Sequence, residues 1–312
     1  MRIVITGALG HIGSRLIREL PSAFPGTEIL MLDNLLTERY CSLFDLSATG
    51  CYRFLETDVL KANFAPLFEG ADAVIHLAAI TNAPASFENK DEIEEVNFVG
   101  TERVARACIE TGCALIFPST TSVYGTQDET VDENCALTDL NPQSPYAESK
   151  LKAEQLLQSL GEKSGLLFTI CRFGTIFGIS AGMRFHTAIN KFCWQAVMGL
   201  PITVWRTALN QNRPYLELGD AIESVKFIMR RKLYDRKIYN VLTLNTSVKA
   251  IVDTIASHVP DMTIEYVDTA IMNQLSYQVL NRRFKDLGFE FRGDLEEGIG
   301  ETIKLIRQAH QR

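Results

Sequence analysis

Hydrophobic residues in the first 180 positions gather into short runs, many of them β-branched, and segments with helical spacing separate these runs. Arg2–Thr6 predicts a first strand, and the apolar residues between 11 and 20 recur at helical spacing before Pro21. Further strands are predicted at 28–32, 52–55, 73–77, 114–117 and 167–171. This alternation predicts an α/β fold, a Rossmann-type doubly wound parallel sheet that is covered on both faces.

Two long helices are expected at 90–112 and 146–162, and their apolar stripes are typical of a core or of a dimer seam. After residue 179 the simple alternation weakens, so we expect helix and loop over 183–214 and a helix over 220–231. The pattern favours a first domain over 1–178 and a smaller, mainly substrate-binding region over 179–312, some segments of which return to the sheet.

Composition excludes several classes of protein. The net charge of −7, with 31 basic residues spread along the chain, argues against a nucleic-acid surface. No apolar run is long enough to cross a bilayer, and no export signal is visible at the first residues. The seven cysteines show no paired spacing, and the five histidines are dispersed. We therefore expect reduced thiols, a cytoplasmic location and no metal site.

Three glycines follow the first strand directly, and their spacing suits a bound dinucleotide. Gly7, Gly10 and Gly13 allow a sharp turn, and the helix that follows offers free N–H groups to a diphosphate. Asp33 ends the second predicted strand, where a carboxylate binds the adenosine ribose and repels a 2′-phosphate. The pattern favours NAD over NADP. Alternatively, Asp33 only caps the following turn through Asn34.

Tyr146 and Lys150 place a phenol and an ammonium one helical turn apart, after Pro145. A tyrosine titrates near pH 10, so it needs a nearby cation to act as a base at neutral pH, and Lys150 is the candidate. The alternative is a surface tyrosine above a solvated lysine. The fifth strand runs into a hydroxyl-rich loop over 117–125, whose Ser119 and Ser122 serve either catalysis or turn formation.

These motifs together resemble the extended short-chain dehydrogenase/reductase family, and within it the NAD-dependent nucleotide-sugar epimerases and dehydratases. The resemblance implies a catalytic set of Thr120, Tyr146 and Lys150, a homodimer and a nucleotide-sugar substrate. The implied NAD-binding positions, besides Tyr146 and Lys150, are Gly7, Gly10, His11, Ile12, Gly13, Asp33, Asn34, Asp58, Val59, Leu77, Ala78, Ala79, Asn97 and Phe173. The implied substrate-binding positions are Thr81, Thr120, Thr121, Tyr146, Thr175 and Arg213, the last of which would hold the diphosphate.

The catalytic loop separates the reactions of the family. Dehydratases that resemble this chain carry an Asp-Glu pair after the catalytic Thr, whereas Thr121 and Ser122 stand here. The resemblance therefore implies C4 epimerisation, in which Tyr146 removes the proton of the sugar 4-OH and a transient 4-keto sugar forms. Thr175 replaces an asparagine that is usual in the family, which suggests an unusual substrate. A nucleotide-sugar dehydrogenase, reductase or dehydratase remains the alternative, and a non-catalytic NAD-binding scaffold is the alternative of another class.

Overall fold

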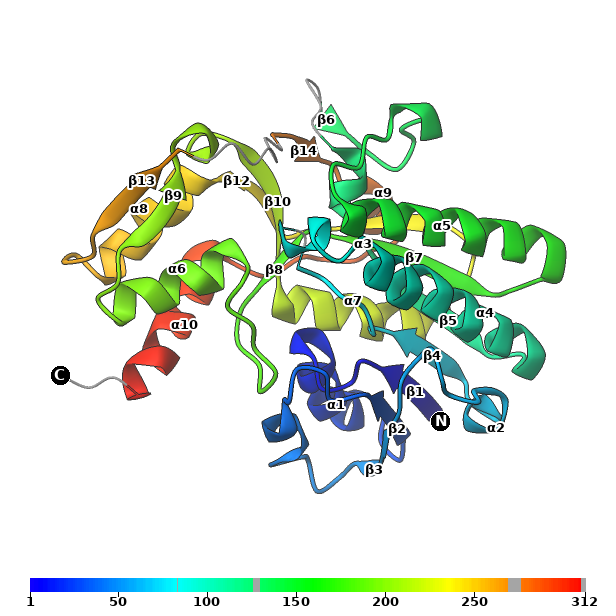
Figure 1. The fold of residues 1–312 in the computed structure, drawn as a ribbon. Helices are drawn as coiled ribbons and strands as arrows, with labels where there is room; N and C mark the ends of the chain where they lie inside the picture. Colours follow the sequence, from blue (N-terminus) through cyan, green and yellow to red (C-terminus); the bar gives the residue numbers. More distant parts are fainter. Residues whose placement is uncertain (83, 126–129, 269–275, 310–312) are drawn as a thin grey trace.

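A computed structural model describes residues 1–82, 84–125, 130–268 and 276–309 of the chain (Figure 1). Its centre is a seven-stranded parallel sheet in the order β11-β7-β5-β4-β1-β2-β3. The strands are β1 (Arg2–Thr6), β2 (Glu28–Asp33), β3 (Cys51–Glu56), β4 (Ala73–His76), β5 (Ala114–Thr120), β7 (Phe168–Phe173) and β11 (Ile238–Val241). The predicted Rossmann-type fold is confirmed, and every predicted strand is present to within three residues at each end.

Helices cover both faces of this sheet, as Figure 1 shows. α1 (His11–Ala23) and α7 (Leu218–Arg231) pack on one face, and α2 (Ala65–Phe68), α4 (Gly100–Thr111) and α5 (Pro145–Ser164) pack on the other. The strands alternate accordingly, because Ile3 and Ile5 point towards α1 and α7 while Val4 points towards α4 and α5. The loops that follow the carboxyl ends of β1, β4 and β5 therefore meet at one edge, where a doubly wound sheet binds its ligands.

The helix expected over 90–112 contains an irregular turn. It consists of α3 (Lys90–Ile93), a π-helical stretch over Glu94–Val99 and α4. Asn97 lies in this stretch, only 1% exposed, and its side chain is bonded to the backbone of the β4 loop. A π-helical turn often marks a functional position in a helix, and here it directs an amide towards the edge of the sheet where the site lies.

The prediction for 183–214 was wrong in part. α6 (Ala188–Val197) is a helix, but β9 (Ile202–Trp205) and the start of β10 (Asn212–Glu217) are strands. These strands are short and pair with β13 (Ile264–Val267), β8 (Thr175–Phe177) and β12 (Leu244–Ser247), so the pattern within 183–214 gives little sign of them.

The remaining elements complete the C-terminal region and the loops. Three helices, α6, α8 (Val248–His258) and α10 (Leu295–Ala309), share a separate apolar core. The others are β6 (Thr130–Val131), β14 (Gln278–Val279), α9 (Arg282–Asp286) and 3₁₀ turns at Tyr40–Leu43, Pro84–Phe87, Thr121–Tyr124, Leu137–Asp139 and Arg206–Ala208. Within the described ranges, no helix has both the length and the apolar character needed to cross a membrane.

Candidate active site

The phenol of Tyr146 contacts the end of β5. Tyr146 lies in the first turn of α5, which is capped by Ser144, whose hydroxyl accepts the N–H of Ala147 at 3.2 Å. The Tyr146 hydroxyl is hydrogen-bonded to the side chain of Thr120, the last residue of β5. Burial raises the pKa of Tyr146, whereas the charge of Arg184 and the hydrogen bond to Thr120 lower it. The structure thus brings two of the expected catalytic residues into contact.

Lys150 lies one turn further along α5 and is 4% exposed. Its ammonium donates to the carbonyl of Pro118 at 2.9 Å and lies 4.5 Å from the centroid of the Phe117 ring. Burial lowers the pKa of Lys150 to about 8, and the nearby carboxylate of Glu154 raises it. Among the described residues Arg184 is the cation whose charge lowers the pKa of Tyr146, and the role of Lys150 towards Tyr146 stays a prediction.

The glycine turn leaves no room for side chains. Gly7 has a φ of +66°, and a Cβ there would lie 2.6 Å from the backbone nitrogen of Ala78. A Cβ on Gly13 would lie 2.6 Å from the carbonyl oxygen of Gly7. Around Gly10 the nearest atoms are farther, at 3.3 Å, so its outer side is open to the groove. A bare backbone at the N-terminus of α1 fits a dinucleotide diphosphate.

Asp33 caps the following turn, and its carboxylate also faces the groove. Its Oδ1 accepts the N–H of Leu35 at 2.9 Å and so caps the following turn, while Oδ2 accepts the N–H of Leu9 in the glycine turn at 3.0 Å. The carboxylate is nevertheless partly exposed and lines the groove. These two bonds fix its orientation, and the remaining lone pairs are available to ribose hydroxyls.

Two adjoining cavities, of about 350 and 310 Å³, form one groove along this edge of the sheet. The first lies at the Asp33 end, the second lies beside Tyr146, and the glycine turn lines both. Together they contain most of the predicted site residues: Gly7, Gly10, His11, Ile12, Gly13, Asp33, Asn34, Val59, Leu77, Ala78, Ala79, Thr81, Thr120, Tyr146, Lys150, Phe173, Thr175 and Arg213.

Three predicted residues do not line either cavity. Asp58 accepts a hydrogen bond from the amide of Asn34 at 2.9 Å. Asn97 accepts the N–H of Ile80 at 2.8 Å and donates to its carbonyl at 3.0 Å, so it shapes the β4 loop. Thr121 is 2% exposed and lies 3.4 Å from the hydroxyl of Tyr277, within the protein. Ser122, the residue after Thr121, faces the cavity instead.

Comparison with known proteins identifies the family. Residues 3–241 match the NAD dependent epimerase/dehydratase family. The chain belongs to this family. A trifunctional UDP-glucose 4,6-dehydratase/UDP-4-keto-6-deoxy-D-glucose 3,5-epimerase/UDP-4-keto-L-rhamnose-reductase of Arabidopsis thaliana is 30% identical over 319 residues, which cover 97% of this chain and 46% of that protein. The chain thus spans about half the length of the plant relatives that it matches.

Two solved structures share the fold of the family along nearly the whole chain. MoeE5 in complex with UDP-glucuronic acid and NAD is 25% identical, with a TM-score of 0.86 over 99% of this chain and 100% of that chain. A UDP-glucuronic acid 4-epimerase from Bacillus cereus, solved with UDP-glucuronic acid and NAD, is 22% identical, with a TM-score of 0.88 over the same shares. The chain therefore has the fold of the NAD dependent epimerase/dehydratase family, to which it belongs.

The structure adds residues to the family site that sequence reasoning missed. Arg39, Arg184, His186 and Trp205 line the cavity beside Tyr146. None of the first three lies in a helix or strand or in a periodic pattern, so only their charge could have indicated them. Arg184 reaches across the groove and donates to the hydroxyl of Thr81. The described lining of this cavity contains four basic side chains, those of Arg39, Lys150, Arg184 and Arg213. It contains no Asp or Glu.

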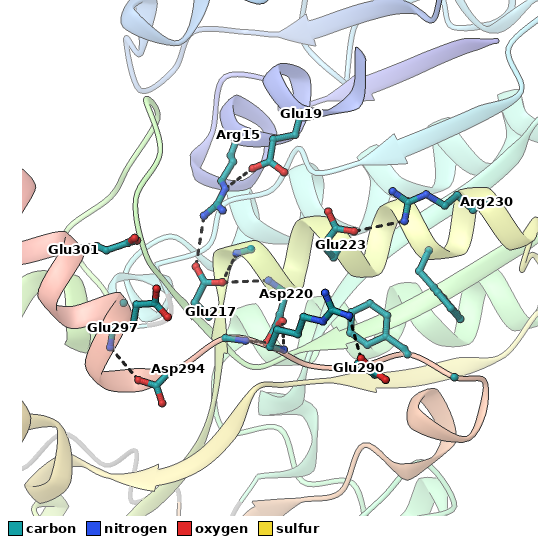
Figure 2. A pocket seen from close by; sticks show the side chains of 17 residues that line it. Arg15, Glu19, Glu217, Asp220, Glu223, Arg230, Glu290, Asp294, Glu297 and Glu301 are labelled. Atoms are coloured by element: carbon teal, nitrogen blue, oxygen red, sulfur yellow. Dashed lines mark hydrogen bonds and ion pairs between the residues drawn. The ribbon is translucent and has the colours of Figure 1, made fainter. Parts of the chain in front are cut away.

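A larger cavity, of about 700 Å³, has the opposite charge and lies between α1, α7 and the segment that leads into α10 (Figure 2). Its acidic residues are Glu19, Glu217, Asp220, Glu223, Glu290, Asp294, Glu297 and Glu301. Glu217 caps α7 by accepting the N–H of Gly219 at 2.6 Å, and Asp220 accepts the N–H of Arg292 at 2.8 Å. None of the family motifs lies here, so we do not assign the catalytic site to this cavity.

Proposed function

We propose that this enzyme is a nucleotide-sugar 4-epimerase and that its substrate is a nucleoside-diphosphate uronate. The observation that carries the proposal is the cavity beside Tyr146, where a phenol bonded to Thr120 is surrounded by cations. Tyr146 would remove the proton of the sugar 4-OH and later return it. The glycine turn and Asp33 would hold NAD, which would supply a reversible acceptor for the hydride of C4. Turning the sugar between these two steps inverts C4.

Dehydration is the alternative that the curated relatives raise, and the lining of the cavity argues against it. Elimination of water from the sugar needs a general acid and a general base in addition to the tyrosine. Positions 121 and 122 hold Thr and Ser, and no carboxylate lines the catalytic cavity within the described part of the chain. Reversible oxidation at C4 needs neither group.

Arg184 supports an acidic sugar. Its guanidinium lies near Tyr146, where the sugar reacts, and its Nε is buried with no hydrogen-bond partner among the described residues. Burial lowers the pKa of Arg184, and the repulsion of Arg39 acts in the same direction. A planar cation with an unused donor pairs with a carboxylate through two parallel hydrogen bonds. A uronate places such a group on the carbon next to C4.

Product analysis tests the proposal directly. We expect the purified holoenzyme to convert UDP-glucuronate into a mixture of its C4 epimers, with no change in mass and no net NADH. A product lighter by one water would indicate a dehydratase, and accumulating NADH would indicate a dehydrogenase. Absence of any turnover with UDP-glucuronate, UDP-glucose and UDP-N-acetylglucosamine would favour a scaffold.

The substitution Arg184→Gln should change substrate preference. We expect kcat/KM for UDP-glucuronate to fall by about ten- to a hundred-fold, since a hydrogen bond to a charged group contributes about 1.5–3 kcal/mol. The value for neutral UDP-glucose should change by less than about threefold. Steady-state kinetics on both sugars measure the ratio, with Arg184→Lys as the variant that keeps the charge but loses the planar fork. An equal loss on both sugars would contradict the assignment to a carboxylate.

We also propose a cytoplasmic homodimer. The outer faces of α4 and α5 support it, because Val99, at the start of α4, is 38% exposed and Lys152 of α5 pairs with Glu94 at 2.8 Å along the same surface. The seven cysteines are all free, as expected of a reducing compartment. Sedimentation equilibrium tests the dimer, and a mass of one chain at micromolar concentration would exclude it.

A further inference from the structure

The loop over 179–187 closes over the glycine turn from the C-terminal half of the chain. It leaves the sheet after β8 and returns to α6, and in Figure 1 it extends down to α1. The N–H of Gly182 donates to the hydroxyl of Ser14 at 2.8 Å. A Cβ on Gly182 would lie 2.3 Å from the carbonyl oxygen of Leu9, so the loop packs directly on the turn. Only glycine permits this approach.

Three further contacts hold the same loop. His11 donates through Nε2 to the carbonyl of Gly178 at 2.9 Å. Asn190, at the start of α6, donates to the carbonyl of Arg184 at 3.1 Å. The thiol of Cys41 donates to the carbonyl of Ala181 at 3.3 Å, which ties the loop to the segment that follows β2. The loop is thus fixed on both sides of the groove.

These contacts bring two arginines and a histidine together where the two cavities join. Arg39 comes from the segment after β2, and Arg184 and His186 come from the loop; all three line both cavities. Burial, together with the charges of Arg184 and Arg39, lowers the pKa of His186 to about 4, so its imidazole is neutral at neutral pH. Burial also lowers the pKa of Arg39, while Asp33 raises it. Such a cluster is unfavourable unless an anion joins it.

The groups around this junction lack protein partners. Neither the half-buried Arg39 nor the exposed His186 forms a hydrogen bond or an ion pair with any described residue. His11 is 4% exposed, and its Nδ1 has no hydrogen-bond partner in the described part of the chain. Burial lowers the pKa of His11 to about 3, and Arg184, Arg39 and His186 act in the same direction. A buried imidazole nitrogen without a partner, beside an arginine without a hydrogen-bonded counter-charge among the described residues, indicates a polar ligand at this junction.

We propose that the cation Arg39, with the neutral imidazole of His186 beside it as a hydrogen-bond donor, forms a second half of the NAD diphosphate site, facing the glycine turn across the groove. The diphosphate fits because it is a dianion that must pass over Gly7 and Gly10, which line the same junction. The glycine turn would hold one side of it through backbone N–H groups, and the loop would cover the other. The enzyme thereby retains NAD between turnovers. This inference rests on the use of NAD and is independent of the proposed sugar.

Exchange of bound NAD tests the proposal on the intact holoenzyme. We expect Arg39→Gln to exchange its NAD for isotope-labelled NAD about ten- to a hundred-fold faster than the unaltered protein, with a smaller acceleration in His186→Gln. Arg53, an exposed residue of β3, provides the matched control: Arg53→Gln should not change the rate of NAD exchange. Added salt should accelerate exchange in the unaltered protein more than in Arg39→Gln, because screening weakens the same contact.

The nucleotide sugar also carries a diphosphate, so binding of UDP to the holoenzyme is measured by calorimetry in parallel. The proposal predicts an unchanged dissociation constant for UDP in both variants. Weaker UDP binding with an unchanged rate of NAD exchange would assign Arg39 and His186 to the substrate site and overturn the proposal. An unchanged rate of NAD exchange would overturn it even if UDP binding did not change. Arg39→Lys, which keeps the charge, should restore most of the retention and serves if Arg39→Gln does not fold.

Discussion

Replacing Tyr146 by Phe should abolish turnover and leave the bound NAD in place. The phenol is hydrogen-bonded to Thr120 and is the group placed to take a proton from the sugar. General acid–base catalysis by a positioned side chain contributes about a hundred- to ten-thousand-fold, so kcat should fall by that factor. Phe keeps the ring in the same position, and the fold should not change. Single-turnover kinetics with UDP-glucuronate and the NAD content of the purified protein measure the two effects.

A second Tyr→Phe substitution controls for the loss of a hydroxyl as such. Tyr52 lies on β3, away from the catalytic cavity, and its hydroxyl donates to the carbonyl of Ile17 at 3.1 Å. Tyr52→Phe should leave kcat unchanged. If Tyr146→Phe retained more than about a tenth of the activity, Tyr146 would not be the base.

Residues whose role depends on local chain geometry could be predicted from the sequence. The backbone atoms closest to the three glycines belong to the turn itself or to the segment that follows β4. Tyr146 and Lys150 lie on one helix. Such arrangements follow from helix periodicity and from the steric freedom of glycine. The family and the use of NAD, both expected on these motifs, are confirmed. The roles of the individual residues stay predictions.

Residues that reach the site from distant loops could not be predicted. Arg39, Arg184 and His186 come together because the loop over 179–187 packs on the glycine turn, a contact between segments more than 160 residues apart. Hydrophobic periodicity carries no information about such a contact. The orientation of the Thr121 side chain could not be predicted either, because its hydroxyl lies beside that of Tyr277, which is 156 positions away in the sequence. The arginines that line the groove could therefore not be predicted from the sequence pattern.

A buried ion pair beneath the catalytic loop leads to the second large effect. Glu154 of α5 and Arg172 of β7 are 2% and 3% exposed, and three hydrogen bonds of 2.7, 3.1 and 3.2 Å join them. Ser119 donates to the same carboxylate, and the guanidinium lies 4.8 Å from the centroid of the Tyr124 ring. Burial is the largest single influence and lowers the pKa of Arg172, but the charge and the hydrogen bonds of Glu154, together with Tyr124, outweigh it and raise that pKa, so Arg172 stays charged. The pair fixes the residue next to Thr120.

Glu154→Ala should lower the free energy of unfolding by about 3–5 kcal/mol, because it leaves Arg172 buried without its counter-charge. Urea denaturation measures the loss, which would appear as a lower midpoint at an unchanged slope. The double variant Glu154→Ala with Arg172→Met should be more stable than Glu154→Ala, since removing both charges also removes the cost of burying one alone. Additive losses in the double variant would mean that the pair acts by packing. Ser119, which donates to Glu154, is the neighbour of Thr120. Measuring kcat for the same single and double variants therefore separates the support that the ion pair gives the catalytic loop from its effect on stability.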